Sequence, residues 1–345
     1  MGDEGEPDLA TVIPVFNEAP YIEACLSSLL HQSVDPASHM ILVLDGGSTD
    51  DTVERVEKLA ALHASTAFPR LLLVSNPERT VAHARNLALE ILPDSVEFLV
   101  EMIGHAEVDP DHIAQRRTAW TACEALAGAS LAGVGVRVES ASQQPNRLSQ
   151  YIDAALASPL AQSGGQFHRI QSIEPTKVPA FVMHRRSALE AVSGWNSDFI
   201  TSQDSELSMR LLDAGYALYR SPVPVVAMHK RDRWLKWWKM GHRYGFWRTK
   251  VLKKHPRRAS WKEFLPWLGA LSTATMWVTN ISMWWVLAAM YGFVLCGVGL
   301  RSMVRLRSPL ALFGVPLCLV MLHTSFSIGL VDGLLRQGRM PTDRA

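Results

Sequence analysis

Cysteine is scarce in this sequence, and its start lacks a leader. The 345 residues include four cysteines, whose spacing is typical of neither a metal site nor a disulfide framework: Cys25, Cys123, Cys296 and Cys318. We interpret them as ordinary small apolar residues. The first eight residues are acidic and lack the basic and apolar regions of a secretory signal peptide. We therefore expect the N-terminal part to remain in the cytoplasm.

Charge is missing from a long part of the chain. Phe264 to Leu300 contains no charged residue, and these 37 residues exceed the ~20 that one transmembrane helix requires. A polar dip at Thr279–Ser282 predicts either two short spans or one span and an interfacial helix. A second apolar stretch runs from Pro309 to Val331. The alternative is that these stretches are buried core helices.

A strongly basic segment precedes the apolar stretches. His229 to Lys262 holds thirteen Lys and Arg against one acid, although the whole chain has a net charge of only +1. The segment also carries five tryptophans, which suits the headgroup region of an anionic membrane. Nucleic acid would suit it too, but the apolar neighbours favour a membrane. The positive-inside rule places this segment and the arginines of residues 301–307 in the cytoplasm, as in a multi-pass membrane protein.

The N-terminal part has the pattern of an α/β domain. Apolar runs at Ala10–Phe16 and Met40–Leu44 predict buried strands, each ending in polar, turn-forming residues, with a helix over Tyr21–Leu30 between them. In open α/β sheets, nucleotides bind at such strand ends. We expect the polar, Gly/Ser-rich residues 140–178 to be irregular. We also expect strands at Leu71–Ser75, Val96–Ile103 and Ala132–Val138. Further helices are expected from Thr52 onward and at Val81–Ile91 and Asp111–Leu126.

The segments Thr11–Glu18 and Met40–Thr52 resemble those of the inverting family-2 glycosyltransferases of the GT-A fold. The resemblance implies a Rossmann-like domain that binds a nucleotide diphosphate sugar. It assigns the donor site to residues at the two strand ends, the last of which contacts the base: Pro14, Asn17, Glu18 and Asp45. The alternative is that polar strand ends occur in any Rossmann-like protein.

An Ala-Arg-Asn element lies in the helix predicted over Val81–Ile91. In the family this arginine reaches the ribose or diphosphate of the donor, so the resemblance implies that Arg85 binds the donor. A cation there is physically sensible, because the leaving diphosphate carries the developing charge. The alternative is an arginine on the protein surface whose side chain lies along its own helix and keeps its charge in water.

The fourth strand departs from the family, which normally ends it in Asp-x-Asp to hold a divalent cation. A subgroup similar to the succinoglycan-type exopolysaccharide transferases has Asp-Gly-His-Ala there, and this chain has Ile103 in place of the aspartate. His105 is then the best metal-ligand candidate, for Mn rather than Mg, because imidazole suits the softer ion. Glu101 shares a strand face with Ile103 and could partly substitute, and Glu107 adds a carboxylate in the loop.

A Gln-Asp-Ser-Glu run begins the helix predicted from Ser202, where the family has Glu-Asp-x-Glu with a catalytic aspartate. Inverting transfer needs one carboxylate to take the proton of the acceptor hydroxyl, and the resemblance assigns this role to Asp204. A helix-capping aspartate is the alternative. Gln203 and Glu206 are expected on the acceptor side. So is Arg243, in an Arg-Tyr-Gly element that matches the same subgroup.

The sequence thus predicts a GT-A domain over residues 8–228, a membrane-interface segment over 229–262 and two to three transmembrane helices over 263–335. The resemblance implies an inverting transfer of one sugar from a nucleotide diphosphate sugar to a lipid-linked glycan or polyprenyl acceptor, with a divalent cation as cofactor. Two alternatives remain open. One is a catalytically impaired scaffold that binds nucleotide sugar in a polysaccharide assembly complex, and the other is a polyprenyl-phosphate sugar synthase.

Overall fold

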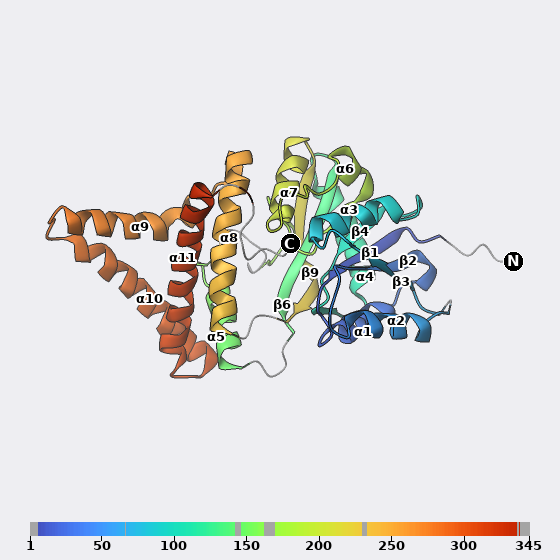
Figure 1. Cartoon of the computed structure of the whole chain (residues 1–345), viewed down its shortest axis with the longest axis horizontal. Coiled ribbons are helices and arrows are strands. Elements are labelled where there is room, and N and C mark those ends of the chain that lie inside the picture. The colour runs from blue at the N-terminus through green and yellow to red at the C-terminus, as the bar shows by residue number, and fades with distance from the viewer. Residues whose placement is uncertain are drawn as a thin grey trace. The chain divides into compact units, whose positions relative to one another are not determined.

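The computed structural model describes residues 6–65, 67–141, 146–161, 170–229, 233–336 and 338. The chain divides into two compact units (Figure 1). The sheet unit contains the described residues up to 141 and from 170 to 229. The helical unit contains residues 146–161 and those from 233 onward. Each unit is described by itself.

The described strands of the sheet unit form one nine-stranded sheet in the order β3-β2-β1-β4-β8-β6-β9-β5, with β7 also paired to β9. The strands β1 to β4 are mutually parallel, and β8 runs against both of its neighbours. Because β8 is antiparallel to β4 and β6, the carboxyl ends of β1, β2, β4 and β6 share one edge. The strands are β1 Leu9–Val15, β2 His39–Asp45, β3 Arg70–Ser75, β4 Phe98–Glu101, β5 Ala106–Val108, β6 Leu131–Ser140, β7 Glu174–Pro175, β8 Met183–Arg185 and β9 Ala217–Met228.

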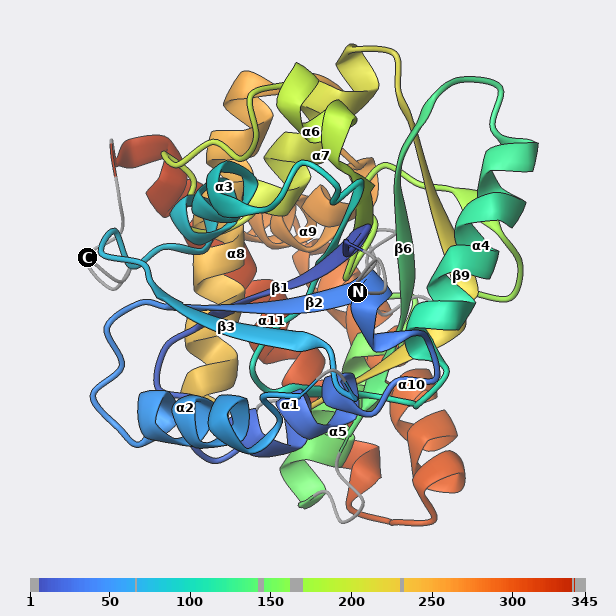
Figure 2. The same cartoon turned by 90° about the vertical axis from the view of Figure 1, so that its right-hand side faces the viewer.

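Helices cover both faces of this sheet (Figure 2). On one face, Ala10, Val12 and Leu42 pack with residues of α3, α6 and α7, and on the other Leu9 and Val100 pack with α4. The alternation of these strand residues between faces is the two-residue period of a β-strand. The helices are α1 Ile22–Leu30, α2 Thr52–Leu62, α3 Val81–Ile91, α4 His112–Leu126, α6 Arg186–Ala191 and α7 Gln203–Asp213, with a 3-10 turn at Pro36–Ser38.

The helical unit is built around α11, whose buried residues pack with those of three other helices. Two of its helices, α10 and α11, are long and apolar enough to cross a membrane, judged by length and composition. The turn between α9 and α10 falls at the predicted polar dip. The helices are α5 Arg147–Leu156, α8 Trp234–Lys254, α9 Trp261–Val278, α10 Trp284–Leu306 and α11 Ala311–Leu335, with a 3-10 turn at Pro256–Arg258.

Two sequence expectations differ from the structure. Residues 140–178 are expected from the sequence to be irregular, but they contain α5, which packs with the helical unit, and β7, which pairs with β9 in the sheet unit. Asn146 caps α5 by accepting a hydrogen bond from the Ser149 amide, and Tyr151, Ile152 and Ala155 have helical spacing. The fourth strand is also shorter than predicted and ends at Glu101.

Candidate active site

The loops that follow β1 and β2 are joined by hydrogen bonds through the predicted donor residues. The Asn17 side-chain oxygen accepts a 2.8 Å hydrogen bond from the Thr49 backbone amide, and the Asn17 backbone amide donates to Ser48 Oγ at 2.9 Å. The Glu18 amide donates to Thr52 Oγ1 at 2.8 Å. Asn17 has a φ of 55°, a left-handed conformation that asparagine tolerates better than most residues. Asn17 therefore holds the two strand-end loops in one place, whatever else it binds.

Asp45 and Pro14 lie at this same edge of the sheet. The Asp45 carboxylate is nearly buried and accepts bonds from the amides of Gly47 at 2.9 Å and Ser48 at 3.1 Å. Gly47 has a φ of +80°, which glycine adopts without strain, and this conformation allows the turn. Pro14 pairs with Leu44 in the register of β1 and β2 and is half-buried. The part of Asp45 in base recognition stays a prediction.

The loop after β4 approaches the loop after β1 closely at a glycine. A Cβ at Gly104 would lie 2.9 Å from Glu18 Cγ, so any larger residue there would have to displace the Glu18 side chain. The next residue, His105, has its Nδ1 2.9 Å from Glu18 Oε1, with one third of its side chain exposed. Two residues predicted separately, for the donor and for the metal, are therefore in direct contact.

Three further residues surround this pair, and the sequence analysis did not assign two of them to a site. The amide of His229 donates to the His105 carbonyl at 2.9 Å, and His229 Nε2 lies 3.0 Å from Glu107 Oε1. The Tyr21 ring lies 4.7 Å from the His229 ring and 6.3 Å from the His105 ring. The position of His229 directly after the last strand, β9, is the sequence feature that could have indicated a site residue. The predicted bounds place His229 in the basic segment, which begins at residue 229.

Arg85 and Glu101 form a buried ion pair beside this edge. Arg85 Nη2 lies 3.1 Å from Glu101 Oε2, and His184 Nε2 lies 3.1 Å from Glu101 Oε1. The Arg85 guanidinium also lies over the Trp195 ring at 5.6 Å. Burial alone would raise the pKa of the Glu101 carboxyl, but Arg85 and His184 outweigh it and leave that pKa below its usual value. The carboxylate is thus ionised and occupied within the protein.

This pairing corrects two of the alternatives considered for the sequence. Glu101 is buried with both oxygens engaged, so it does not substitute for the missing aspartate as a metal ligand in this geometry. Arg85 is 6% exposed and is therefore not a surface arginine. Its Nε and Nη1 are buried and lack a hydrogen-bond partner among the described residues. The neighbouring Asn86 side chain donates a hydrogen bond to the Trp195 carbonyl and accepts one from the Trp195 amide, which stabilises the turn at Gly194 and Trp195.

The predicted base lies in the first turn of α7. The connection to β9 is only three residues long, so α7 runs back along the sheet and its N-terminus is directed toward the edge where β9 ends. Asp204 is the second helical residue and is half-buried, as is Gln203, and Asp204 Oδ1 accepts a 2.8 Å bond from the Ser205 amide. The cap position belongs to Ser202, so Asp204 is not the N-cap residue.

The remaining acceptor candidates are Glu206, also on α7, and Arg243, on α8 of the helical unit. Glu206 is fully buried and forms a 2.8 Å ion pair with Arg210, whose guanidinium also donates to the Val192 and Gly194 carbonyls. Through Arg210, Glu206 therefore connects α7 to the turn after α6, and this geometry does not support a role for Glu206 at the acceptor. Arg243 is half-buried on α8 in the helical unit. Its proposed part at the acceptor stays a prediction.

The described residues contain no group of three or more His, Cys, Asp or Glu placed to hold a metal ion. The residues His105 and Glu18 nevertheless fit part of a metal site. In known metal sites a ligating histidine commonly bonds a carboxylate through its other nitrogen, and the Glu18 contact to His105 Nδ1 has this form. Nε2 of His105 then remains for a cation, whose other ligands would include phosphate oxygens of a substrate.

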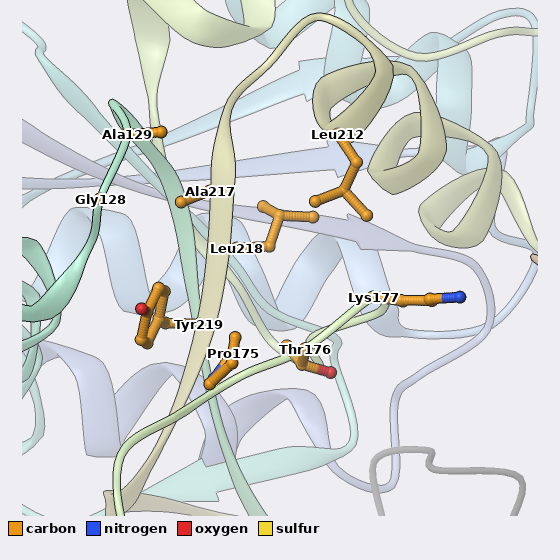
Figure 3. Close-up of a pocket in the computed structure, with 9 residues that line it drawn as sticks. All are labelled: Gly128, Ala129, Pro175, Thr176, Lys177, Leu212, Ala217, Leu218 and Tyr219. Atoms are coloured by element: carbon orange, nitrogen blue, oxygen red, sulfur yellow. The ribbon is translucent and has the colours of Figure 1, made fainter.

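A cavity of about 490 Å³ lies at the other edge of the sheet, around the first residues of β9 (Figure 3). Leu212, Ala217 and Leu218 line it, while the Lys177 amine points away from these apolar side chains. None of the predicted site residues lines it. The cavity is therefore separate from the strand-end site.

The fold and this site define a class of protein. A mixed sheet flanked by helices, with joined loops at the carboxyl ends of its parallel strands β1 and β2, is an arrangement in which α/β proteins bind nucleotides. A profile of "Glycosyl transferase family 2" matches residues 11–192, and one of "Glycosyl transferase family group 2" matches residues 142–331. The first match spans more than half of the chain, which therefore belongs to glycosyl transferase family 2 and is a glycosyltransferase.

Similar proteins agree with this assignment. The succinoglycan biosynthesis protein ExoA of Rhizobium meliloti is 27% identical over 94% of both chains. A dolichyl N-acetyl-glucosaminyl phosphate glucuronosyltransferase of Methanococcus voltae is 23% identical over 95% of this chain and 97% of its own. The mannosyltransferase PcManGT of Pyrobaculum calidifontis, solved with GDP-Man and Mn2+, has a TM-score of 0.59 and 21% identity over 96% of this chain and 88% of its own. The predicted family and GT-A fold class are confirmed.

Proposed function

We propose that the protein is a membrane-attached inverting glycosyltransferase that moves one sugar from a nucleotide diphosphate sugar to a lipid-linked glycan or polyprenyl acceptor. The single observation that carries the proposal is the meeting of the β1, β2 and β4 loops at one edge, with Glu18 against His105. The apolar helices α10 and α11 support a lipid-soluble acceptor at the membrane. The basic segment supports a cytoplasmic position for the sheet unit.

In the proposed reaction the acceptor hydroxyl oxygen attacks the anomeric carbon, and the bond from that carbon to the diphosphate breaks with inversion. Asp204 takes the hydroxyl proton as the attack proceeds. The Arg85 guanidinium supplies positive charge for the diphosphate, and Asn17, Glu18 and Asp45 shape the loops that hold the nucleotide. Gln203, which cannot ionise, orients the acceptor beside Asp204.

We further propose that His105 ligates a divalent cation through Nε2, with His229 as a second nitrogen donor nearby. The cation, when bound, would neutralise the leaving diphosphate. Two imidazoles favour Mn over Mg, because nitrogen ligands suit the softer ion. The structural relative PcManGT was solved with Mn2+, which supports this choice without deciding it.

The proposed class of acceptor is based on the apolar helices and on the names of similar proteins. One relative is named for succinoglycan biosynthesis, and another for transfer to a dolichyl-linked sugar phosphate. The first name refers to the synthesis of a glycan, and the second refers to transfer to a lipid-linked sugar. A glycan acceptor is therefore favoured over bare polyprenyl phosphate.

A scaffold that binds nucleotide sugar without turnover is the second candidate. Ile103 in place of the usual aspartate, Gln203 in place of the usual glutamate, and the missing three-ligand cluster among the described residues favour it. A donor screen separates the two. Membranes containing the full chain are incubated with nucleotide sugars, and the release of nucleoside diphosphate is followed.

The central variant in this screen is Asp204→Asn. It should keep membrane attachment and donor binding, because the change is nearly isosteric, and lose turnover by roughly a hundredfold, the scale of a general base. Asp213→Asn is the matched control, because Asp213 is exposed in the last turn of the same helix. Equal turnover in wild type and Asp204→Asn would refute the base assignment. Absence of turnover with every donor and lipid fraction would favour the scaffold.

The metal is tested by removal and replacement. Excess chelator should abolish nucleoside diphosphate release, and Mn should restore it better than Mg. His105→Gln should need roughly tenfold more Mn for half-maximal activity, because one ligand is lost. Full turnover in excess chelator would remove the metal and leave Arg85 as the counter-charge for the diphosphate.

A further inference from the structure

The helices α8 and α11 pack side by side, in parallel, along nearly their whole lengths. At one end the Trp237 indole donates to the Cys318 carbonyl at 3.0 Å, and at the other Lys250 Nζ donates to the Arg336 carbonyl at 2.5 Å. Between these ends the contact is made by glycines. A Cβ at Gly245 would lie 2.1 Å from the Phe326 carbonyl oxygen, and one at Gly329 would lie 2.1 Å from that of His242.

Such close backbone contact means that the two helices share one depth in any membrane. Small residues that let backbones approach are the usual means by which helices pair tightly. An α-helix of 21 residues, like α8, is about 31 Å long, close to the hydrocarbon thickness of a bilayer. If α11 crossed the bilayer, α8 would have to cross beside it.

The charges of α8 oppose such a crossing. Seven of its 21 residues are Lys or Arg, and none is acidic. Lys236 and Lys239 are exposed near its start, Lys253 is exposed near its end, and Arg243 is half-buried near its middle. Side chains near the ends could reach water, but Arg243 lies about 13 Å from the first residue of α8 at 1.5 Å per residue. A charge at that depth in hydrocarbon is strongly unfavourable.

Exposed apolar side chains occur on α9, α10 and α11, but α9 and α10 do not share the close backbone contact that joins α11 to the charged helix α8. No residue of α9 is buried, and the exposed side chains of the pair include Trp277, Trp285 and Phe293. Figure 1 shows α9 and α10 as the two arms of a V, with α11 between this V and α8. Glu263, at the start of α9, bonds Arg248 of α8 at 3.2 Å, so one arm begins at the carboxyl end of α8. The other arm ends where α11 begins, at Gly299 against Leu312.

We infer that α8 and α11 lie in the plane of an anionic membrane surface, and that the α9–α10 hairpin is the part that enters the hydrocarbon. The basic face of α8 meets the headgroups and water, and α11 lies beneath it. The helix α11 therefore does not span the bilayer, despite its length and apolar composition. The inference rests on the membrane attachment in the proposed function. Its direct consequence is that both ends of α11 lie on the same side of the membrane.

The test is a comparison of two cysteine variants of the full chain in sealed membrane vesicles. The exposed Cys296 is first replaced by serine, while the buried Cys25, Cys123 and Cys318 are kept. Ser308→Cys then marks the start of α11, and Arg336→Cys marks its end. A membrane-impermeant maleimide is applied to vesicles of each orientation, before and after permeabilisation.

We expect both cysteines to be labelled in vesicles that expose the cytoplasmic face, and neither to be labelled in the opposite orientation. Labelling of one position only, with the other reached after permeabilisation, would overturn the inference and leave the membrane attachment intact. Release of the whole protein by an alkaline carbonate wash would instead refute the membrane attachment, and the inference with it. Nucleoside diphosphate release by each variant reports separately whether the enzyme remains active.

Discussion

The sheet unit and the helical unit treat apolar residues in opposite ways, although both contain buried, paired carboxylates. In the sheet unit Ile13, Ile41 and Leu44 are fully buried, and the buried Glu101 is paired. In the helical unit Phe293 is 81% exposed and Val304 is 73% exposed. A unit surrounded by water gains by burying apolar surface, whereas one surrounded by lipid does not, because lipid tails are as apolar as leucine. This difference in apolar exposure agrees with the proposed membrane attachment of the helical unit.

The buried ion pair of the sheet unit should give the largest effect on stability. Glu101→Gln keeps the shape but leaves Arg85 buried without a counter-charge, and the expected loss of unfolding free energy is about 3–5 kcal/mol. Glu139→Gln is the matched control, because the pair of Glu139 with Arg137 is largely exposed and contributes at most about 1 kcal/mol. Urea unfolding of the full chain in detergent measures both. Equal losses would mean that Arg85 finds another partner.

Glycine contacts should have the next largest effect, in the helical unit. Gly245→Ala forces a methyl group into the Phe326 carbonyl and should destabilise the α8–α11 pair by about 1–3 kcal/mol. Gly297→Ala is the control on α10, where an added Cβ meets nothing within 4 Å. It should be neutral or stabilising by up to about 1 kcal/mol, since alanine favours helix. Thermal unfolding in detergent distinguishes the two, and equal melting temperatures would contradict tight α8–α11 packing.

A buried histidine should give the sheet unit a smaller, pH-dependent effect. Burial, reinforced by Arg117, lowers the pKa of His39 to about 3, against an ordinary value of 6.5. Above pH 6.5 both folded and unfolded states hold a neutral imidazole, so His39 has no effect. Between pH 6.5 and 3 only the unfolded state binds the proton, and stability falls as pH falls, by about 1.4 kcal/mol per pH unit at most.

The measurement is urea unfolding at pH 7 and pH 5, in wild type and in His39→Gln. The variant should lose part of the pH dependence and keep the rest, because burial also lowers the pKa of His112 well below its ordinary value. An unchanged slope in His39→Gln would show that the His39 imidazole is protonated in the folded protein.

Most elements of the fold were predictable because their signals are local. The helix Val81–Ile91 was predicted with its observed bounds, since Thr80 supplies a cap to the His83 amide and Leu92 is already extended. The strands β1 and β2 were within one residue at each end, because apolar runs stop where polar turn residues begin. The helix α5 was missed because its apolar residues lie in a stretch dominated by Ser and Gln.

The candidate site was predicted residue by residue, but its contacts were not. The resemblance singled out Glu18 and His105 for different tasks, and nothing local shows that two residues 87 positions apart in the chain come within 2.9 Å of each other. The same holds for His229, which the sequence assigned to the basic segment. Their meeting depends on the strand order, which places β4 beside β1 and β5 beside β9.

The sequence by itself determined the family, the α/β alternation and the separation of the chain into a polar part and an apolar part. The family came from the resemblance of its motifs, whereas the elements and the polar and apolar parts came from short-range patterns of hydrophobicity and turn residues, which act over one strand or one turn of helix. Only the tertiary structure decided which charges are buried in pairs and which helices lie together. Glu101 meets Arg85, and α8 meets α11, through contacts between segments far apart in the chain, and the free energy of a buried charge or a close glycine contact exists only once both partners are in place.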